Sequence, residues 1–388
     1  MKTVGIVAEY NPFHTGHAWH IAQTRQLFQE ETAVIAVMSG NWVQRGECAV
    51  TDKWTRAGMA LAGGADLVLE LPTVWAAASA EGFARGAVSI LAATGVVDVL
   101  SFGSECGAIA PLCTLAQCLN SPEFSTALRR ELGPKRSFAR CRRQAAEALL
   151  GPEAASLLDF PNNNLGVEYL RFLPPGMEAV TIPRRGPAHD GEDAGEYAPA
   201  SLLRQRLRSG EAEAISAFLP VPWSGEPADL KWCERAILAR LRSMALEEAK
   251  ALPDSGDGLA TRLLTASRSA TDLEQLYTLT KTRTYAHSRV RRLVLYALLG
   301  LREQDRPSAP PYLRVLAFNS RGQGLLKAMN QSACVPLLVK TAHIRSSRFS
   351  PAAQALFSLE ERFTDLYALC FPTPRPGGLE WTAGPIIY

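Results

Sequence analysis

The stretch from Gly5 to His17 reads GIVAEYNPFHTGH, and the rest of the chain is arranged around it. The residues at its start, Val4 to Ala8, are small and apolar, which is typical of a central parallel strand covered on both faces. Pro12 ends that strand, because proline has no N–H to donate to a neighbouring strand. Thr15 can cap a following helix, and Gly16 lets another group approach the backbone closely. The pattern predicts a buried strand, a break and then a helix.

Two histidines, His14 and His17, stand at the start of this predicted helix. At this spacing their imidazoles lie side by side, with the free N–H groups of the first turn behind them. A helix N-terminus attracts anions, and imidazole donors add hydrogen bonds that strengthen as a phosphate gains charge. The pair is therefore a candidate phosphate site. Capping or core packing by two histidines is the structural alternative.

The same stretch resembles a known family of enzymes. A His-x-Gly-His element after a first strand is similar to that of the nucleotidyltransferase superfamily, whose catalytic domains are Rossmann-like. Two further runs, SGNWVQRGE at 39–47 and DKWTR at 52–56, extend the resemblance to the tRNA(Met) cytidine acetate ligase family. The resemblance covers nearly the whole chain, and its most specific motifs lie before residue 110.

The length and composition of the chain narrow the possible classes of protein only broadly. The chain has 388 residues, enough for two domains, and no apolar run approaches the roughly twenty residues of a membrane helix. Without a secretory segment at its start, we expect a cytoplasmic protein with no membrane contact and no obligate protein partner. The 8 cysteines include no Cys-x-x-Cys pair, so a zinc site is not expected, and no metal ligands are identified. The net charge of +3 is too small to indicate nucleic-acid binding, so any such indication must come from local clusters of charge.

Strand-like and helix-like segments alternate along the first half of the chain. The expected strands after the first are 33–38, 66–71, 97–103 and 178–182. This alternation predicts an α/β fold with a parallel sheet. The Pro/Gly/Ser-rich run 220–227 predicts a linker, and helical patterns dominate beyond it. We therefore expect a Rossmann-like (HUP-type) nucleotidyltransferase domain over 1–219 and a mainly α-helical domain over 220–388.

Ligands bind such sheets at the carboxyl ends of the strands, where the candidate ATP contacts gather. Asn162 can meet a purine edge or only cap a helix, and Arg184 or Arg185 can pair with phosphate. At the expected pyrophosphate site, only Ser201 supplies a hydroxyl, with Arg204 three residues later. The resemblance implies His14 and His17 as the catalytic residues. The full ATP-binding set is Val7, Ala8, Glu9, Tyr10, Asn11, Pro12, Phe13, His14, Thr15, Gly16, His17, His20, Gly103, Asn162, Arg184, Arg185, Ser201 and Arg204.

The most basic segment of the second half is KTRTYAHSRVRR at 281–292. Basic side chains interleaved with aromatic ones suit phosphate tracking along RNA, although a surface salt-bridge helix fits the pattern equally well. The resemblance favours RNA and implies tRNA contacts at Lys281, Arg283, Tyr285, His287, Arg289 and Arg292. A second arginine-rich stretch, 129–143, is by default a solvated helical face, with an RNA-facing surface as the alternative.

The motif at 14–17 supports attack of a nucleophile on the α-phosphorus of ATP, with Mg²⁺ expected to neutralise the triphosphate. The resemblance implies acetate as that nucleophile. Acetyl-AMP would then acetylate N4 of the wobble cytidine of elongator tRNA(Met). Lys53 and Arg56 are candidate contacts to a carboxylate or RNA, with surface roles as the alternative, and small residues near Gly40, Ala49 and Ala76 could select acetate. A small-molecule adenylyltransferase and a non-catalytic RNA-binding protein are the rival functions.

Overall fold

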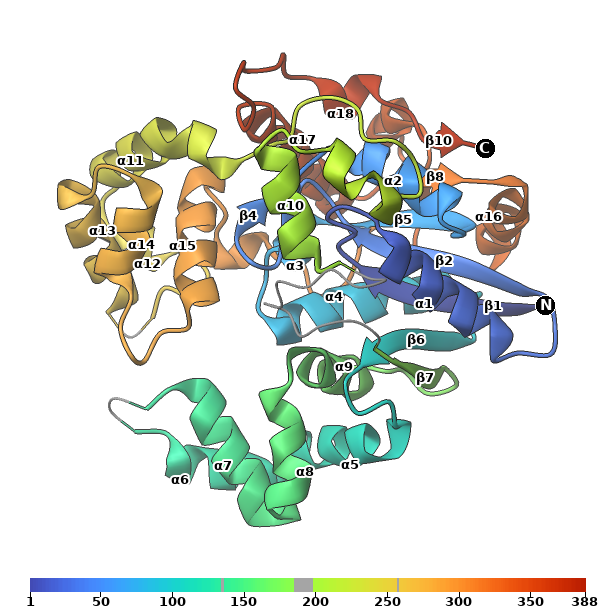
Figure 1. The fold of residues 1–388 in the computed structure, drawn as a ribbon, viewed down its shortest axis with the longest axis horizontal. Coiled ribbons are helices and arrows are strands. Elements are labelled where there is room, and N and C mark those ends of the chain that lie inside the picture. Colours follow the sequence, from blue (N-terminus) through green and yellow to red (C-terminus); the bar gives the residue numbers. More distant parts are fainter. Residues whose placement is uncertain (134–135, 185–197, 257) are drawn as a thin grey trace.

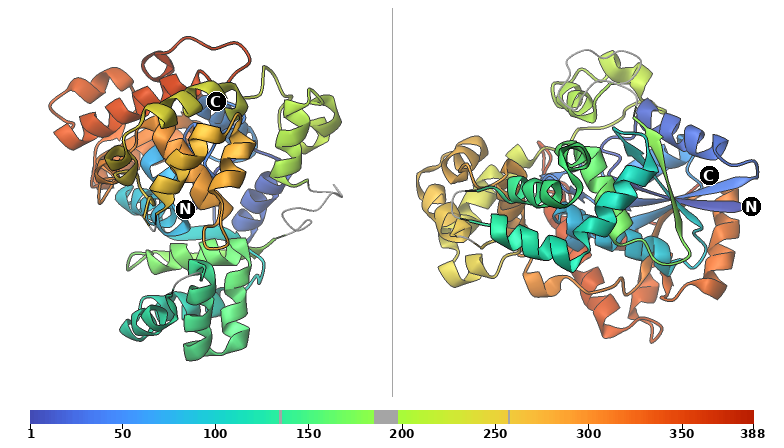
Figure 2. Two further views of the ribbon diagram at one scale, coloured as in Figure 1. Left: turned by 90° about the vertical axis from the view of Figure 1, so that its left-hand side faces the viewer. Right: turned by 90° about the horizontal axis from the view of Figure 1, so that it is seen from below.

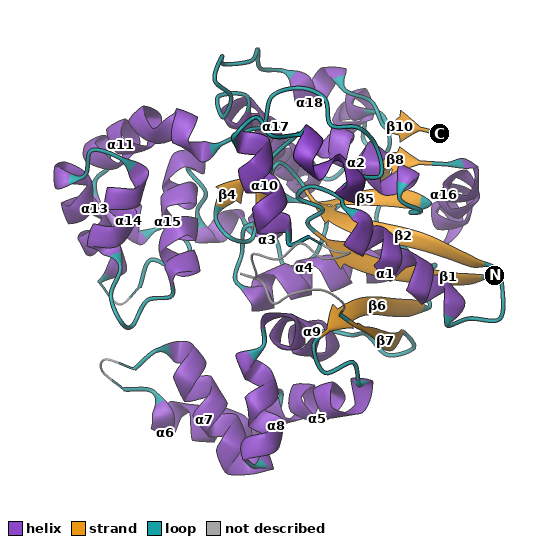
Figure 3. Cartoon of the chain, viewed as in Figure 1, coloured by secondary structure: helices purple, strands orange, loops and turns teal. Residues whose placement is uncertain are grey.

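A central sheet with helices packed on both of its faces forms the body of the molecule (Figures 1 and 3). The computed structural model describes residues 1–133, 136–184, 198–256 and 258–388. The strand order is β10-β8-β5-β2-β1-β6-β7, and β9 pairs with β8. The strands are β1 (Lys2–Ala8), β2 (Thr32–Ser39), β5 (Leu67–Leu71), β6 (Val99–Ser104), β7 (Glu178–Pro183), β8 (Leu313–Phe318), β9 (Leu337–Leu338) and β10 (Ile386–Ile387).

The strand β1 lies in the middle of a parallel core, as the sequence predicts. It pairs in parallel with β2 on one side and with β6 on the other. The order β5-β2-β1-β6-β7 reverses direction at β1, which is the doubly wound, Rossmann-like arrangement. The expected α/β class is thereby confirmed. A crevice for a ligand is expected where the order reverses, at the carboxyl ends of β1 and β6.

Residues of β2 alternate between two hydrophobic layers, because successive side chains of a strand point to opposite faces. Ile35 and Val37 join the layer that includes α4, whereas Val34 and Ala36 join the layer that includes α1 and α2. Burial on both faces explains why the strand is an unbroken apolar run. The helices next to these strands are α1 (Thr15–Gln26), α2 (Lys53–Ala62), α3 (Thr73–Ala76), α4 (Ala80–Ala93) and α16 (Ser320–Ser332).

Two helical lobes extend from the sheet, as Figures 1 and 2 show. The first lobe lies between β6 and β7 in the chain and comprises α5 (Ile109–Leu119), α6 (Pro122–Glu131), α7 (Phe138–Leu150), α8 (Pro152–Ser156) and α9 (Pro161–Arg171). The second comprises α11 (Glu234–Ser243), α12 (Leu246–Lys250), α13 (Leu259–Ser269), α14 (Leu273–Thr280) and α15 (His287–Leu299). The other helices are α10 (Ala200–Arg208), α17 (Pro351–Tyr367) and α18 (Leu379–Thr382). None of the described helices is both long and apolar enough to span a membrane.

The sheet continues past the expected domain boundary between residues 219 and 220. The segment 230–299 is helical as expected, but β8 pairs antiparallel with β5, and β10 pairs with β8. The second half of the chain therefore completes the sheet of the first half. Local patterning identifies an apolar strand near 313–318 but carries no information about which distant edge it joins, because that choice depends on long-range packing.

Lys53 and Arg56 are fully buried, so neither the expected contact with a ligand nor the surface alternative is correct. The Lys53 ammonium pairs with Glu70 on β5 over 2.6 Å and with Glu380 on α18 over 2.7 Å. Arg56 donates to the backbone carbonyls of Glu9 (2.7 Å) and Ser39 (3.0 Å) at the ends of β1 and β2. Both cations are therefore scaffold groups beneath the carboxyl edge of the sheet.

The same buried cluster includes Glu360 on α17, whose carboxyl group accepts the Thr73 N–H over 2.6 Å. Burial and the neighbouring Glu70 raise the pKa of Glu360 to about 8. Since its ordinary pKa is 4.5, the folded chain holds a proton that the unfolded chain releases between these values. The stabilising contribution is complete below pH 4.5 and is lost as the pH rises through about 8.

We expect the melting temperature of the native protein to fall between pH 5 and 8.5 more steeply than that of Glu360→Gln, since the amide cannot ionise. Thermal unfolding in a series of buffers measures this directly. Identical pH profiles for the two proteins would contradict the assignment to Glu360.

Candidate active site

A cavity of about 710 Å³ opens at the carboxyl ends of β1 and β6, where the topology predicts a ligand. It is bordered by the first turn of α1, the start of α9, the start of α10 and the first turns of α15. Its walls thus come from both halves of the chain. The predicted ATP residues that line it are Val7, Ala8, Glu9, Tyr10, Asn11, His14, Gly16, His17, His20, Gly103, Asn162, Arg184 and Arg204.

The cap of α1 is His14 rather than Thr15, which is the first residue of the helix. The Nδ1 atom of His14 accepts the Gly16 N–H over 3.1 Å. In return, Nδ1 of His17 accepts the N–H of His14 over 3.2 Å. These two bonds make a capping box from histidines and hold the rings stacked, with centroids 3.7 Å apart. Histidine is an uncommon N-cap, which is why the sequence favours Thr15 for this role.

The hydrogen bonds also decide which nitrogen carries the proton. A neutral imidazole whose Nδ1 accepts a hydrogen bond must hold its proton on Nε2. Burial, with the nearby Arg184 and Arg204, lowers the pKa of His14 to about 3, and burial, with the neighbouring His14, lowers the pKa of His17. Both rings are therefore neutral at pH 7, and each presents one Nε2–H donor.

Aromatic packing fixes the position of His17. Its ring lies at the edge of Tyr10, with centroids 4.8 Å apart, and Tyr10 in turn packs on Phe13. Tyr10 has a φ of 47°, in the left-handed region that non-glycine residues rarely adopt. Strain of this kind persists where the surrounding structure enforces it, often at functional sites. Here it turns the chain sharply from β1 into the helix mouth.

Arg184 is held over the cavity by the first turn of α9. Its Nη1 donates to Oδ1 of Asn162 over 2.7 Å. The Asn162 amide donates to Glu105 over 2.6 Å, and the same carboxylate accepts the N–H of Asn163 over 2.7 Å. Asn162 is thus already engaged by two charged side chains, which favours a role in positioning Arg184 over a role as a simple helix cap.

Another arginine approaches the cavity from α10. Arg204 donates to the carbonyl of Asn11 over 2.8 Å, next to the histidine motif. Ala198, Pro199 and Ala200 line the cavity at the start of this helix. Ser201 follows them but is not among the residues that line the cavity. A phosphate here would meet backbone N–H groups and a guanidinium rather than a serine hydroxyl.

The hairpin of β3 (Trp42–Val43) and β4 (Glu47–Cys48) packs against α15 beside the cavity. Gly46 in its turn has a φ of 75°, and a Cβ there would lie 2.5 Å from the backbone of Arg291. Only glycine permits this approach. Glu47 of the hairpin pairs with Arg291, whose guanidinium also lies over the ring of Tyr277 at 5.1 Å. Hairpin and helix therefore form one wall.

The predicted tRNA residues divide into two groups. His287 and Arg292 line the cavity, whereas Lys281, Arg283, Tyr285 and Arg289 do not. Lys281 and Arg283 lie in the loop before α15. Arg292 is buried and pairs with Asp254 over 3.2 Å, and Arg289 donates to the carbonyl of the same residue over 3.0 Å. Part of this basic segment therefore holds its own lobe together.

Several other predicted site residues lie away from the cavity. Of the predicted ATP residues, Pro12, Phe13 and Thr15 do not line it, and Phe13 is a fully buried core residue that packs against Gly63. Arg185 lies outside the described residues. Gly40, Ala49 and Ala76 are buried in the scaffold and do not line the cavity, so they are not its selecting walls.

Sequence reasoning also missed part of the cavity wall. Among the missed residues are Gln44, Arg45, Phe83, Phe102, Tyr169 and Arg291. Of these, Gln44 and Arg45 lie inside the quoted SGNWVQRGE run and Arg291 lies inside the quoted 281–292 segment, so the sequence held a signal for these three.

The described residues contain no group of three or more histidine, cysteine, aspartate or glutamate side chains that could hold a metal ion. Among the described residues that line the large cavity, Glu9 is the sole carboxylate. Burial raises its pKa, and it accepts the Gln44 N–H over 2.9 Å. The described residues of the cavity wall therefore offer a cation only this single carboxylate.

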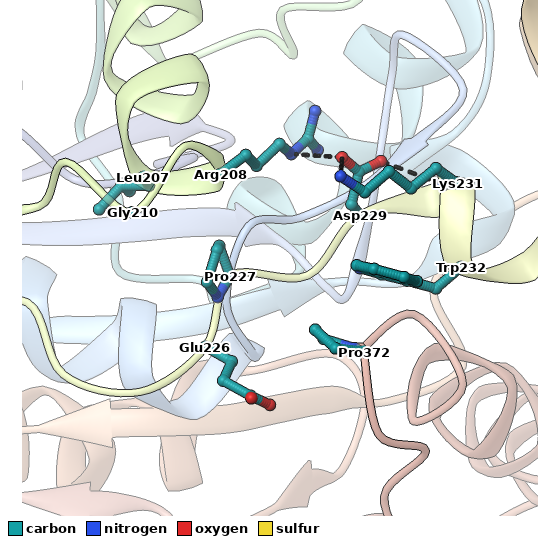
Figure 4. Close-up of a pocket in the computed structure, with 9 residues that line it drawn as sticks. All are labelled: Leu207, Arg208, Gly210, Glu226, Pro227, Asp229, Lys231, Trp232 and Pro372. Carbon is teal, nitrogen blue, oxygen red and sulfur yellow. Dashed lines mark hydrogen bonds and ion pairs between the residues drawn. The ribbon is translucent and has the colours of Figure 1, made fainter.

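A second cavity of about 150 Å³ lies between α10 and the segment 226–232 (Figure 4). Its two cations, Arg208 and Lys231, both approach Asp229, over 3.5 Å and 3.9 Å. The rest of its lining is mostly proline, leucine and the exposed Trp232. With its two cations already paired with Asp229, this cavity is a poorer candidate for a phosphate ligand than the larger one.

The chain is similar over its length to known proteins. A model of the HIGH Nucleotidyl Transferase family matches residues 1–378. A protein of Syntrophomonas wolfei called tRNA(Met) cytidine acetate ligase is 34% identical over 414 residues, covering 100% of this chain and 99% of its own length. One of Acetivibrio thermocellus with the same name is 33% identical, with 100% of both chains covered. The crystal structure of Thermotoga maritima TmcAL bound with alpha-thio ATP superposes with a TM-score of 0.90 at 30% identity, covering 100% of this chain and 99% of the other.

Proposed function

Because this chain belongs to the tRNA(Met) cytidine acetate ligase family of HIGH nucleotidyl transferases, we propose that it activates acetate with ATP and acetylates a tRNA cytidine. The product is N4-acetylcytidine at the wobble position of elongator tRNA(Met). The observation that carries the proposal is the pair of stacked, neutral histidines, whose Nε2–H donors stand at a helix mouth in a cavity shared with α15.

In the first step, an acetate oxygen attacks the α-phosphorus of ATP, and pyrophosphate leaves with the electrons of the broken P–O bond. The enzyme contributes mainly position and charge stabilisation to such a transfer. His14 and His17 donate hydrogen bonds to phosphate oxygens as negative charge develops, and Arg184 and Arg204 hold the phosphates that leave. Neutral donors suit this task because they need no proton exchange between substrate binding and reaction.

In the second step, N4 of the cytidine attacks the acetyl carbonyl, and AMP departs as the leaving group. The base must leave its stack to reach a cavity of this kind. The walls contributed by His287 and Arg292 support this step, because they bring the predicted tRNA segment to the cavity that holds the histidines. This shared cavity also argues against a small-molecule adenylyltransferase, which needs no such second wall.

The proposal includes Mg²⁺ only as an ion that is bound to ATP. With Glu9 as the single carboxylate among the described cavity residues, phosphate oxygens and water would supply most of its ligands. Such an ion would neutralise charge on the triphosphate. Acetate and tRNA are the other substrates, and the expected cytoplasmic location follows from the tRNA substrate.

Pyrophosphate release from ATP tests the proposal, measured with and without acetate and with and without tRNA. We expect release that depends on acetate, and N4-acetylcytidine in the digested tRNA by mass spectrometry. Release that ignores acetate but needs a nucleotide substrate would favour the small-molecule enzyme. No release with all components present would favour a non-catalytic RNA-binding protein.

Arg184→Ala should raise the KM for ATP by about ten- to a hundredfold, because a hydrogen bond to a charged group contributes roughly 1.5–3 kcal/mol. Steady-state kinetics with saturating acetate measures this. Arg206→Ala on the exposed side of α10 is the matched control, since Arg206 pairs with Glu211 away from the cavity. An unchanged KM would remove Arg184 from the phosphate site.

A further inference from the structure

One segment of the first helical lobe is rich in positive charge. Residues 121–150 contain seven lysines and arginines against three glutamates, a net charge of +4, whereas the whole chain carries +3. The remainder of the chain is therefore slightly acidic. A local excess of this size, on a protein of nearly balanced charge, is the kind of footprint that nucleic-acid binding leaves.

Two arginines of this segment have structural roles. Arg142 donates to Oδ1 of Asn164 over 2.8 Å and pairs with the buried Glu168, both on α9. Arg143 pairs with Asp159 over 3.1 Å. Because Asn164 lines the large cavity, the contacts of Arg142 attach α7 directly to the cavity wall.

The other arginines described in this segment face solvent. We define the α6–α7 surface as Arg129, Arg130, Arg136, Arg140 and Phe138. Within the part of the chain that the structure describes, Arg129, Arg130 and Arg140 have no acidic partner, and Arg136 pairs with Glu131 at the surface. Phe138 is 58% exposed. Guanidinium groups bind phosphates and an exposed ring stacks on bases, so this combination suits RNA.

The cations of residues 281–292 are less available to bind phosphate than those of the α6–α7 surface. There, Arg291 is committed to Glu47, and Arg289 and Arg292 to Asp254. A cation with a structural partner must give up that partner before it can neutralise a phosphate. The segment that the sequence singles out therefore offers fewer available charges than its composition indicates, while the α6–α7 surface offers more.

The two basic regions flank the cavity. In Figures 1 and 2, the loop before α15 points toward the first helical lobe, and both lie beyond the carboxyl ends of the parallel strands. The cavity wall contains the first turn of α9 on one side and the first turns of α15 on the other. An RNA loop entering between them would meet cations on both sides.

We propose that the α6–α7 surface binds the phosphate backbone of the tRNA arm that presents the target cytidine, opposite residues 281–292. The proposal rests on the proposed function and adds a second binding surface to it. Holding the arm from two sides would position an extruded base in the cavity, which lowers the entropic cost of the transfer step.

The test is Arg130→Glu combined with Arg140→Glu in the full chain, with tRNA affinity measured by fluorescence anisotropy over a range of salt concentrations. We expect the Kd to rise at least tenfold. We also expect the slope of log affinity against log salt to shrink by roughly 0.7–0.9 for each phosphate that the variant no longer neutralises. Acetate-dependent pyrophosphate release without tRNA should be unchanged, because these side chains do not line the cavity.

Lys327→Glu with Arg348→Glu is the control, because it makes the same change in charge outside this lobe and should leave the Kd near the native value. Arg130→Gln with Arg140→Gln is the milder variant, used if the charge reversal impairs folding. An unchanged Kd and salt slope in a folded variant would overturn the proposal. Failure of the proposed function would appear separately, as a native protein that releases no pyrophosphate with acetate.

Discussion

Replacing His17 by alanine is expected to lower acetate-dependent pyrophosphate release by about 10²–10³-fold, the usual loss for one preorganised donor to a developing charge. The variant loses the Nε2–H donor. It also loses the Nδ1 acceptor for the His14 N–H, a bond of 3.2 Å in the capping box. Removal of a helix cap costs about 1 kcal/mol, so a modest fall in stability should accompany the loss of activity.

Asparagine at position 17 separates these two effects. Its side-chain oxygen can accept the His14 N–H in place of Nδ1, but it has no donor at the place of Nε2. We expect His17→Asn to be nearly as inactive as His17→Ala yet closer to the native melting temperature. His343→Ala, at an exposed histidine far along the chain, should behave as the native protein. A native rate for His17→Asn would remove the Nε2 donor from the reaction.

Replacing Lys53 by methionine is expected to destabilise the fold by about 3–5 kcal/mol, because removal of one partner leaves a buried charge without compensation. Lys53 is fully buried and approaches Glu70 and Glu380 over 2.6 and 2.7 Å. Arg314 also pairs with Glu380, over 3.3 Å, so Glu70 is the carboxylate most affected by the substitution. Thermal and denaturant unfolding measure the effect.

A second substitution can restore the balance of charge. Glu70→Gln added to Lys53→Met leaves Arg314 to compensate Glu380, so the double variant should be more stable than Lys53→Met alone. Lys327→Met, on the exposed face of α16, removes a lysine without burying any charge and should change stability little. A Lys53→Met protein as stable as Lys327→Met would show that the buried pairs contribute nothing.

Sequence reasoning succeeded where the signal is local. The apolar runs and the break at Pro12 predict the strands and the start of α1, because strand and helix periodicity depends on residues that are close in sequence. It was less successful with charged residues. Lys53 and Arg56 look like surface or ligand contacts in the sequence, since a lone lysine or arginine is rarely buried without a partner. Their partners, Glu70, Glu380 and backbone carbonyls, come from segments that no local pattern connects to them.

By itself, the sequence determined the parallel core, the position of the histidine motif after β1 and the family of the chain, because each depends on residues adjacent in the chain. Only the tertiary structure decided which nitrogen of each histidine carries the proton and which arginines already have structural partners. It also decided that β8 completes the sheet and that α15 completes the cavity at the end of β1. Those features depend on hydrogen bonds and ion pairs between residues far apart in sequence, and such contacts exist only once the chain has folded.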